Sequence, residues 1–199
     1  DDGNVTSIHW PRMKEVLKGS IAIEWLPPTI IDCWILNNEL QGTADLTILP
    51  PGMTEFDIHK NRHRGTVDLT QLPEKMECNA LSNNNFHGAV DLGHLPASMT
   101  DVYLDDNNFS GQISLDALPE GIQNLYLASN DFEGSLDLNE VTREMLYLDI
   151  SSTKLSGTIH IRDTDNISLK DSNVTVIPNS PCVELGEDRK RIVSESSEY

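Results

Sequence analysis

Three sets of residues in this chain have types and spacings that could support chemistry. Asp57, His59 and Cys78 could supply an acid, a base and a nucleophile on neighbouring segments. His59 and His63 are four residues apart, a spacing that places two metal ligands on one side of a helix. Single aspartates also recur through the chain and could offer oxygen ligands to calcium. They are Asp45, Asp68, Asp91 and Asp137.

Each set also has a structural interpretation, which the surrounding sequence favours. Nothing near Asp57, His59 and Cys78 would hold an oxyanion, so we predict that the protein is not an enzyme and has no cofactor. His63 stands in a column of phenylalanines, which favours a partly buried core histidine or a solvated basic edge over a metal ligand. Calcium sites cluster several oxygens in one loop, whereas each aspartate here stands alone and suits a turn cap. We therefore predict no metal site.

The elements that must position these residues are set by an internal repeat of 23 residues (42−19). An asparagine four places before each repeated glycine keeps the same register until Thr153 replaces it, and Leu-Pro pairs form a further column. The glycines are Gly19, Gly42, Gly65, Gly88, Gly111, Gly134 and Gly157. A fixed period of this length predicts a solenoid.

The repeated unit reads L-x-L-x-x-N-x-F-x-G-x-h-D-L-x-x-L-P-x-x-M, where h is an apolar residue. Its first half resembles the repeats of the leucine-rich repeat family, and the resemblance extends from Trp10 to about Ile177. Its second half is similar to repeats in proteins of kinetoplastid protists. The resemblance implies a right-handed superhelix of the β/α type, with a parallel sheet on its concave side. Short strands or turns are expected on the convex side, with few helices and no particular activity.

The repeat divides the chain into three parts. Residues 1–18 are expected to form an N-terminal cap, because the strand half of the unit is degenerate there. Residues 19–177 are expected to form one solenoid of about seven to eight coils. The register contracts near its end, where Ile167 follows Leu148 by less than one repeat length. Residues 178–199 are charged and poor in apolar side chains, which predicts a C-terminal cap and flexible tail.

Each coil is expected to supply apolar side chains to one core. Alternating pairs such as Val102 and Leu104 predict a half-buried strand before the turn. A second alternating pair after the glycine, such as Val90 and Leu92, predicts a short second strand on the other wall of the coil.

The asparagine column is interpreted as structural. Where the chain turns out of the strand, buried backbone groups need hydrogen-bond partners. An asparagine amide has two donor hydrogens and an acceptor oxygen, so it can bond its own turn and the next coil. We predict this role, without catalysis, for Asn38, Asn61, Asn84, Asn107 and Asn130.

Charge restricts the class of partner. The chain has 14 basic and 32 acidic residues and a formal net charge of −18. Such a field repels phosphate backbones and anionic lipids, so nucleic-acid and membrane partners are not expected. No apolar run is long enough to cross a bilayer, because Glu24 and Asp32 interrupt the most hydrophobic region. The expected partner is a basic protein.

The cysteines are expected to be free thiols. Cys33 falls in an inward column and Cys78 one place before that column two repeats later, so the two should lie ~10 Å apart and face opposite sides. Cys182 lies beyond the last repeat. Free thiols indicate a reducing compartment, and we expect a cytoplasmic protein. Four N-x-[ST] sequons leave secretion open: Asn4, Asn108, Asn166 and Asn173.

The residues that flank the inward leucines should form the concave face. Three of the four tyrosines and one of the three tryptophans fall there among six carboxylates, which is the composition of a protein-binding surface. Exposed tyrosines also suit strands for reasons unrelated to binding. The residues expected to contact a partner are Trp34, Asp57, Asp101, Tyr103, Asp105, Tyr126, Tyr147 and Asp149.

These observations predict a non-enzymatic protein-interaction module that is monomeric on its own. It would bind a basic protein or peptide through the acidic, tyrosine-bearing concave face. The alternative is a structural scaffold subunit of a larger assembly, in which that face is one contact among several.

Overall fold

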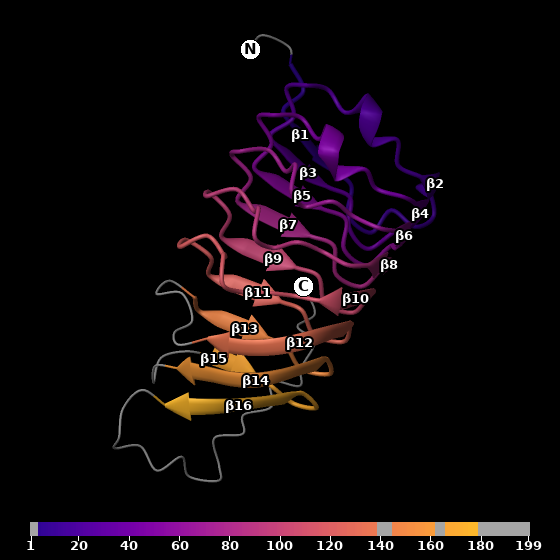
Figure 1. Ribbon diagram of the computed structural model, residues 1–199. Coiled ribbons are helices and arrows are strands. Elements are labelled where there is room, and N and C mark those ends of the chain that lie inside the picture. The colour runs from indigo at the N-terminus through magenta and orange to yellow at the C-terminus, as the bar shows by residue number, and fades with distance from the viewer. Residues whose placement is uncertain (1–3, 139–144, 162–165, 179–199) are drawn as a thin grey trace.

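Each coil of the chain contributes one strand to each of two parallel sheets, and the coils stack into a solenoid (Figure 1). The computed structural model describes residues 4–138, 145–161 and 166–178. Helix within these residues is limited to two single turns, η1 (Ile23–Trp25) and η2 (Leu46–Ile48). The predicted repeat solenoid with few helices is confirmed.

The first sheet contains the odd-numbered strands in chain order. They are β1 (Ser7–His9), β3 (Asp32–Trp34), β5 (Glu55–Asp57), β7 (Cys78–Ala80), β9 (Asp101–Tyr103), β11 (Asn124–Tyr126), β13 (Tyr147–Asp149) and β15 (Asn166–Ser168). Val102, Leu125 and Leu148 are register partners on adjacent strands, and each is at most 1% exposed. The alternation predicted a strand with one buried side at these positions, and the structure confirms it.

The second sheet contains the even-numbered strands, and those from β2 to β10 are labelled to the right of the first sheet in Figure 1. They are β2 (Lys18–Ser20), β4 (Glu39–Gly42), β6 (Arg62–Gly65), β8 (Asn85–Gly88), β10 (Asn108–Gln112), β12 (Asp131–Leu138), β14 (Lys154–Ile161) and β16 (Asn173–Pro178). Aliphatic side chains from both sheets and from the intervening turns pack into one continuous core.

The strands of the second sheet lie earlier in the repeat than the sequence predicted. A strand was expected after each glycine, but β6 and β8 end at Gly65 and Gly88. These glycines have φ values of 98° and 90°, a left-handed conformation that turns the chain out of the ladder. Val90 and Leu92 are buried, at 7% and 2% exposure, without belonging to a strand. The strands that extend well past their glycines are β12 and β14.

Aromatic rings form a buried column beside the second sheet. His63, Phe86, Phe109 and Phe132 stack in sequence, with centroids of neighbouring rings 6.0, 6.1 and 6.0 Å apart. His63 is 1% exposed, so it is a core histidine and not part of a solvated edge. Neither of its ring nitrogens has a hydrogen-bond partner.

The two ends of the solenoid depart from the repeat length. Leu148 is opposite Ile167, which confirms that the last coil is shorter than the repeat. At the other end, β1 lies inside the expected cap and pairs with β3. The boundaries at residues 18 and 178 stay predictions, and the expected tail lies outside the described residues after Pro178.

Candidate functional site

The aspartate column caps turns. Oδ1 of Asp45 and of Asp68 accepts hydrogen bonds from the backbone N–H groups of Thr47 and Thr70, at 3.0 and 2.8 Å. The side chain of the fourth member, Asp137, is not described. In the part of the chain that the structure describes, no three His, Cys, Asp or Glu side chains are grouped as metal ligands. Asp45 and Asp68 therefore have a local role, each capping the turn of its own coil.

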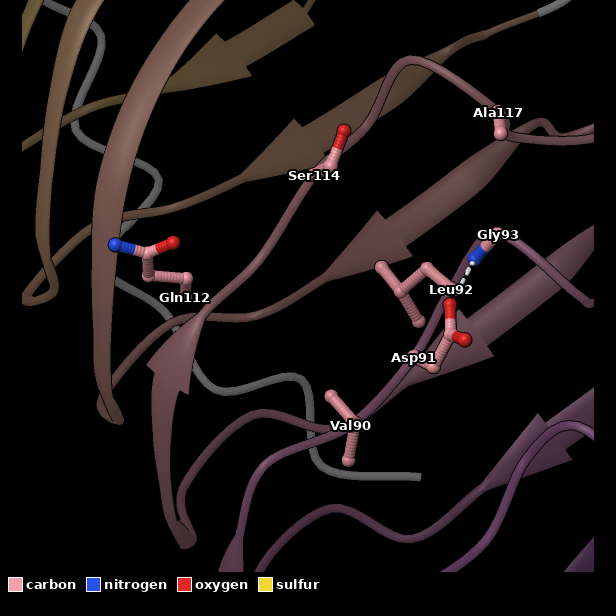
Figure 2. A pocket seen from close by; sticks show the side chains of 7 residues that line it. All are labelled: Val90, Asp91, Leu92, Gly93, Gln112, Ser114 and Ala117. Carbon is pink, nitrogen blue, oxygen red and sulfur yellow. Dashed lines mark hydrogen bonds between the residues drawn. The ribbon is translucent and has the colours of Figure 1, made fainter.

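A shallow cleft of about 280 Å³ opens between two successive coils, beside Asp91 of the aspartate column (Figure 2). Its lining is formed by Val90, Asp91, Leu92, Gly93, Gln112, Ser114 and Ala117. Asp91 is the only charged residue of the lining, and its carboxylate already accepts a hydrogen bond from the backbone N–H of Gly93 at 2.7 Å. This arrangement brings together no acid, base and nucleophile, and we assign no site to it.

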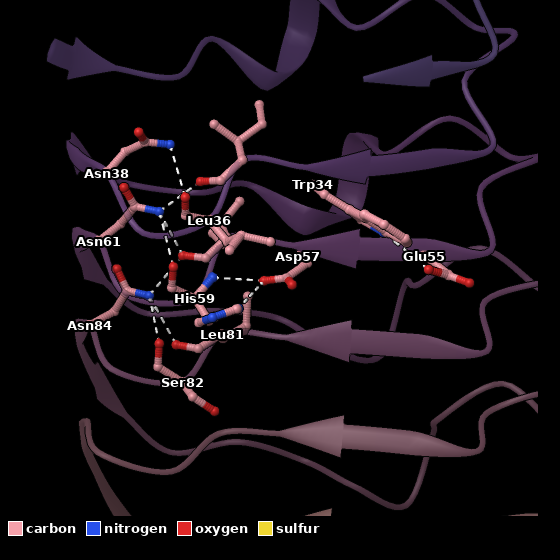
Figure 3. A network of polar contacts seen from close by, with 12 residues as sticks. Trp34, Leu36, Asn38, Glu55, Asp57, His59, Asn61, Leu81, Ser82 and Asn84 are labelled. Carbon is pink, nitrogen blue, oxygen red and sulfur yellow. Dashed lines mark hydrogen bonds and ion pairs between the residues drawn. The ribbon is translucent and has the colours of Figure 1, made fainter. Parts of the chain in front are cut away.

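The asparagine column connects successive coils (Figure 3). Nδ2 of Asn84 lies 3.1 Å from the carbonyl oxygen of Ile58 in the preceding coil and 3.0 Å from that of Leu81 in its own turn. Its Oδ1 accepts the backbone N–H of His63 at 2.9 Å. Asn61, Asn107 and Asn130 repeat this pattern, and Asn38 bonds Trp10 and Met13 in the same way.

The bonds between coils lead to the preceding coil, whereas the sequence analysis expected the next one. The register of the second sheet, in which Gln41 pairs with Arg62 and Gly42 with His63, accounts for the partner that the Oδ1 atom meets. The offset between these partners is shorter than the repeat, which would pair Gly42 with Gly65. It sets Asn84, Asn107 and Asn130 beside the backbone N–H groups of His63, Phe86 and Phe109 in the preceding coil.

The side chains of the first sheet that point away from the core form what we call the outer face. It corresponds to the concave face expected from the sequence, and it contains Trp34, Asp57, Asp101, Tyr103, Asp105, Tyr126, Tyr147 and Asp149 on or directly after β3 to β13. The outward positions of these strands include no lysine or arginine. The charged groups at these outward positions are therefore all carboxylates.

Two tyrosines stack at the centre of the outer face. Tyr103 and Tyr126 are register partners on β9 and β11, and their ring centroids are 5.1 Å apart. The Tyr103 hydroxyl donates to Oδ1 of Asp101 at 3.2 Å. Burial raises the pKa of both phenols, so they stay protonated at neutral pH and present uncharged rings. Tyr147 lies on the next strand and is 45% exposed.

The carboxylates around this pair already have protein partners. Asp101 accepts hydrogen bonds from Asn124 at 2.5 Å and from the Thr100 hydroxyl at 2.6 Å, as well as from the tyrosine. The Ser82 hydroxyl donates to Asp105, and burial raises the pKa of the Asp105 carboxyl. Asp149 accepts the backbone N–H of Ser151 at 2.9 Å. Asp101 therefore both holds a ring and contributes charge, while Asp105 is a weaker acid than an ordinary aspartate.

Polar contacts also fix the end of the outer face near the N-terminus. The indole Nε1 of Trp34 donates to Glu55 at 3.0 Å, and Nδ1 of His59 lies 2.7 Å from Oδ1 of Asp57 (Figure 3). The ring of His9 stacks on Trp34 with centroids 4.2 Å apart and an interplanar angle of 12°.

The sequence analysis missed His9. A constant repeat length places Pro11 beside Trp34, but β1 and β3 pair with a longer offset, which brings His9 there. A histidine near the column that contains Trp34 was the only signal for this contact in the sequence. The stacking itself becomes apparent only from the register of the first coil.

The three residues considered for catalysis do not assemble. Asp57 and His59 form a pair, but Cys78 is opposite Glu55 and Asp101 on the neighbouring strands and not opposite His59. Burial, followed by the nearby carboxylates, raises the pKa of Cys78 to about 12, which leaves almost no thiolate at neutral pH. Cys78 is therefore not placed as a nucleophile beside His59 as its base.

The thiols offer a test of the register. Cys33 and Cys78 are free, Cys33 is fully buried, and Cys78 is half-buried. In a Cys182→Ser background, a thiol reagent should label native Cys78 faster than Cys33, and both at least about tenfold more slowly than in denaturant. Asp101→Asn should accelerate labelling of Cys78, because it removes a negative charge beside the thiol. Equal rates for the two cysteines would contradict the assigned faces.

The architecture defines the class of protein: this chain has the leucine-rich repeat fold. Pollen receptor kinase 3 is 21% identical over 89% of this chain and 79% of that one, with a TM-score of 0.55. The leucine-rich repeat ectodomain of the receptor kinase GASSHO1/SCHENGEN3 from Arabidopsis thaliana, solved with CASPARIAN STRIP INTEGRITY FACTOR 2, is 13% identical over 87% of this chain, with a TM-score of 0.56. The plant peptide hormone receptor RGFR1, solved with RGF2, is 23% identical over 87% of this chain, with a TM-score of 0.57.

The chain spans 25% and 34% of the length of the last two receptors. No protein-family model and no curated protein matches the sequence. The narrower resemblance to kinetoplastid repeats therefore stays a prediction. Among the described residues, no helix is long and apolar enough to cross a membrane.

Proposed function

We propose that this protein is a non-enzymatic interaction module whose outer face binds a basic segment of a partner protein. The observation that carries the proposal is the stacked pair of Tyr103 and Tyr126 within an acidic sheet face. Arginine is the side chain that suits this arrangement, because its guanidinium stacks on aromatic rings and pairs with carboxylates.

The geometry supports a preformed site. Asp101 holds the Tyr103 hydroxyl and the Asn124 amide, so a partner meets rings whose orientation is already fixed. A preorganised site loses less side-chain freedom on binding, which favours affinity. Tyr147 and Asp149 extend the surface across the next strand with a further ring and a carboxylate.

The solved neighbours agree with an interaction role. Two of them were solved in complex with named factors, CASPARIAN STRIP INTEGRITY FACTOR 2 and RGF2. A non-catalytic role is also supported by the position of Cys78, which lies away from His59. We further propose that the isolated chain is a monomer of a reducing, cytoplasmic compartment, for which the free Cys33 and Cys78 are the support.

A scaffold role is the second candidate, and one observation favours it. Seven of the eleven exposed large apolar side chains in the described residues lie between residues 5 and 34. They are Val5, Trp10, Met13, Val16, Trp25, Ile31 and Trp34. Apolar side chains gathered at one end of a solenoid suit a constitutive contact there. Dependence of solubility on a co-expressed partner would favour this role over transient binding.

The proposed site predicts which substitutions weaken binding. Replacing Tyr103 and Tyr126 together by alanine should weaken binding of an arginine-containing peptide at least about tenfold, mainly through faster dissociation. Asp101→Asn should instead slow association and reduce its salt dependence. Surface plasmon resonance at several salt concentrations measures both rates.

The matched control is Asn85→Ala, an exposed position on β8 of the second sheet. It should leave both rates unchanged. Replacing each arginine of the peptide by citrulline keeps the shape of the side chain but removes its charge, and should abolish binding. A loss of less than about fivefold for the double tyrosine variant would show that the outer face is not the site.

A further inference from the structure

The outer face contains two aromatic pairs built in the same way. His9 and Trp34 stack on β1 and β3, and Tyr103 and Tyr126 stack on β9 and β11. All four occupy one register column of the first sheet, in the order His9, Trp34, Asp57, Ala80, Tyr103 and Tyr126. We call these two stacks the tryptophan pair and the tyrosine pair.

Carboxylates of the neighbouring column hold both pairs by their polar ring atoms. Nε2 of His9 lies 2.7 Å from Asp32, and Nε1 of Trp34 donates to Glu55 at 3.0 Å. At the other pair, Asp101 accepts the Tyr103 hydroxyl at 3.2 Å. Each pair therefore offers fixed aromatic rings beside negative charge.

Between the two pairs, the column contains only Asp57 and Ala80. Asp57 faces Trp34 across one strand interval, and its carboxylate is paired with His59 at 2.7 Å. Ala80 faces Tyr103 and has the smallest side chain of the column. This part of the column therefore contains no aromatic ring. It is flanked by the ring of Trp34 on one side and by the ring of Tyr103 on the other.

The two pairs are separated by a distance that an extended peptide can span. Trp34 and Tyr103 are three strand intervals apart, or ~14 Å at ~4.8 Å per interval. An extended chain advances ~3.3 Å per residue, so about four residues cover that distance.

Resting on the proposed function, we infer that the outer face is a bipartite site for an extended segment with two arginines about four residues apart. The segment crosses the strands of the first sheet, with one guanidinium at the tryptophan pair and the other at the tyrosine pair. Asp57, beside Trp34, and Asp101, beside Tyr103, supply the charge for each. Occupying both pairs at once makes the second contact intramolecular, which raises affinity without any new type of interaction.

The test compares two peptides of equal charge that differ only in the spacing of their arginines, together with a peptide that has a single arginine. Arg-x-x-x-Arg, in a glycine–serine background, should bind the wild-type protein at least about tenfold more tightly than Arg-x-Arg or a peptide with one arginine. Trp34→Ala should reduce the affinity for Arg-x-x-x-Arg to that for Arg-x-Arg. Isothermal titration calorimetry with the full chain measures both comparisons.

Trp25→Ala is the matched control, because Trp25 is 80% exposed but lies on η1, outside the first sheet. It should leave the spacing preference intact, and a comparable effect would overturn the assignment to Trp34. Equal affinities for the two spacings, with the dependence on Tyr103 and Tyr126 retained, would overturn the bipartite site alone. Failure of every arginine peptide to bind would overturn the proposed function itself.

Discussion

Asn107→Ala should lower the free energy of unfolding by roughly 3 kcal/mol, near the upper end of the cost of unsatisfied buried groups. Asn107 is 9% exposed, and its Nδ2 lies 3.0 Å from the carbonyl oxygen of Leu81 and 3.1 Å from that of Leu104. Its Oδ1 accepts the backbone N–H of Phe86 at 3.1 Å. Alanine would leave these buried backbone groups of two coils without their side-chain partner.

The adjacent Asn108 is the control for this experiment. It is exposed on β10, so Asn108→Ala should change stability by about 0.5 kcal/mol or less. Urea unfolding followed by circular dichroism measures both variants. Similar losses for the two positions would mean that hydrogen bonding by the inward asparagine does not hold the coils together.

His63→Phe should stabilise the protein, by roughly 1–3 kcal/mol at neutral pH. His63 is 1% exposed and stacks on Phe86 at 6.0 Å, yet both ring nitrogens lack hydrogen-bond partners. A phenyl ring extends the column of Phe86, Phe109 and Phe132 and buries no polar atom. Repacking around the larger ring opposes the gain.

The same substitution should remove a dependence of stability on pH. Burial lowers the pKa of His63 to about 4, whereas an imidazole in the unfolded chain titrates near about 6.5. Between these values the unfolded chain binds more protons than the folded one. The contribution of neutral His63 is therefore complete above about pH 6.5 and is lost as the pH falls toward about 4. By about pH 5 the wild type should lose roughly 2 kcal/mol that His63→Phe keeps.

Carboxylates also titrate in this range, so the measured quantity is the difference between variant and wild type at each pH. His87→Phe provides a control on the next strand, because His87 is exposed on β8. If that variant changes the pH dependence as much as His63→Phe does, the buried ring is not its cause.

Much of the first sheet follows from the period of the sequence. Tyr103 and Tyr126 are one repeat apart and are register partners, as the column predicted. The inward leucines, the free Cys33 and the buried asparagines follow from the same arithmetic. When each coil makes one full turn, residues one repeat apart become register partners on adjacent strands. The columns of the aligned repeats therefore predict the register of the first sheet.

Tertiary structure decided what the period does not contain. Strands of the second sheet such as β4 and β6 pair with an offset shorter than the repeat, and the first coil pairs with a longer one. The shorter offset places the Oδ1 atom of Asn84 next to the backbone N–H of His63, and the longer one stacks His9 on Trp34. These offsets depend on how the turns between the two sheets pack against one another. The repeat specifies only the number of residues in a coil, and not the register of each sheet.

Contacts between coils likewise decide which carboxylates of the outer face hold rings and which stay available for a partner. Asp101 accepts a hydrogen bond from Asn124 because the stacking of β11 on β9 brings the amide within about 3 Å of its oxygen, whereas Tyr103 reaches Asp101 along the same strand. A hydrogen bond requires that closeness, and no column of the sequence encodes it.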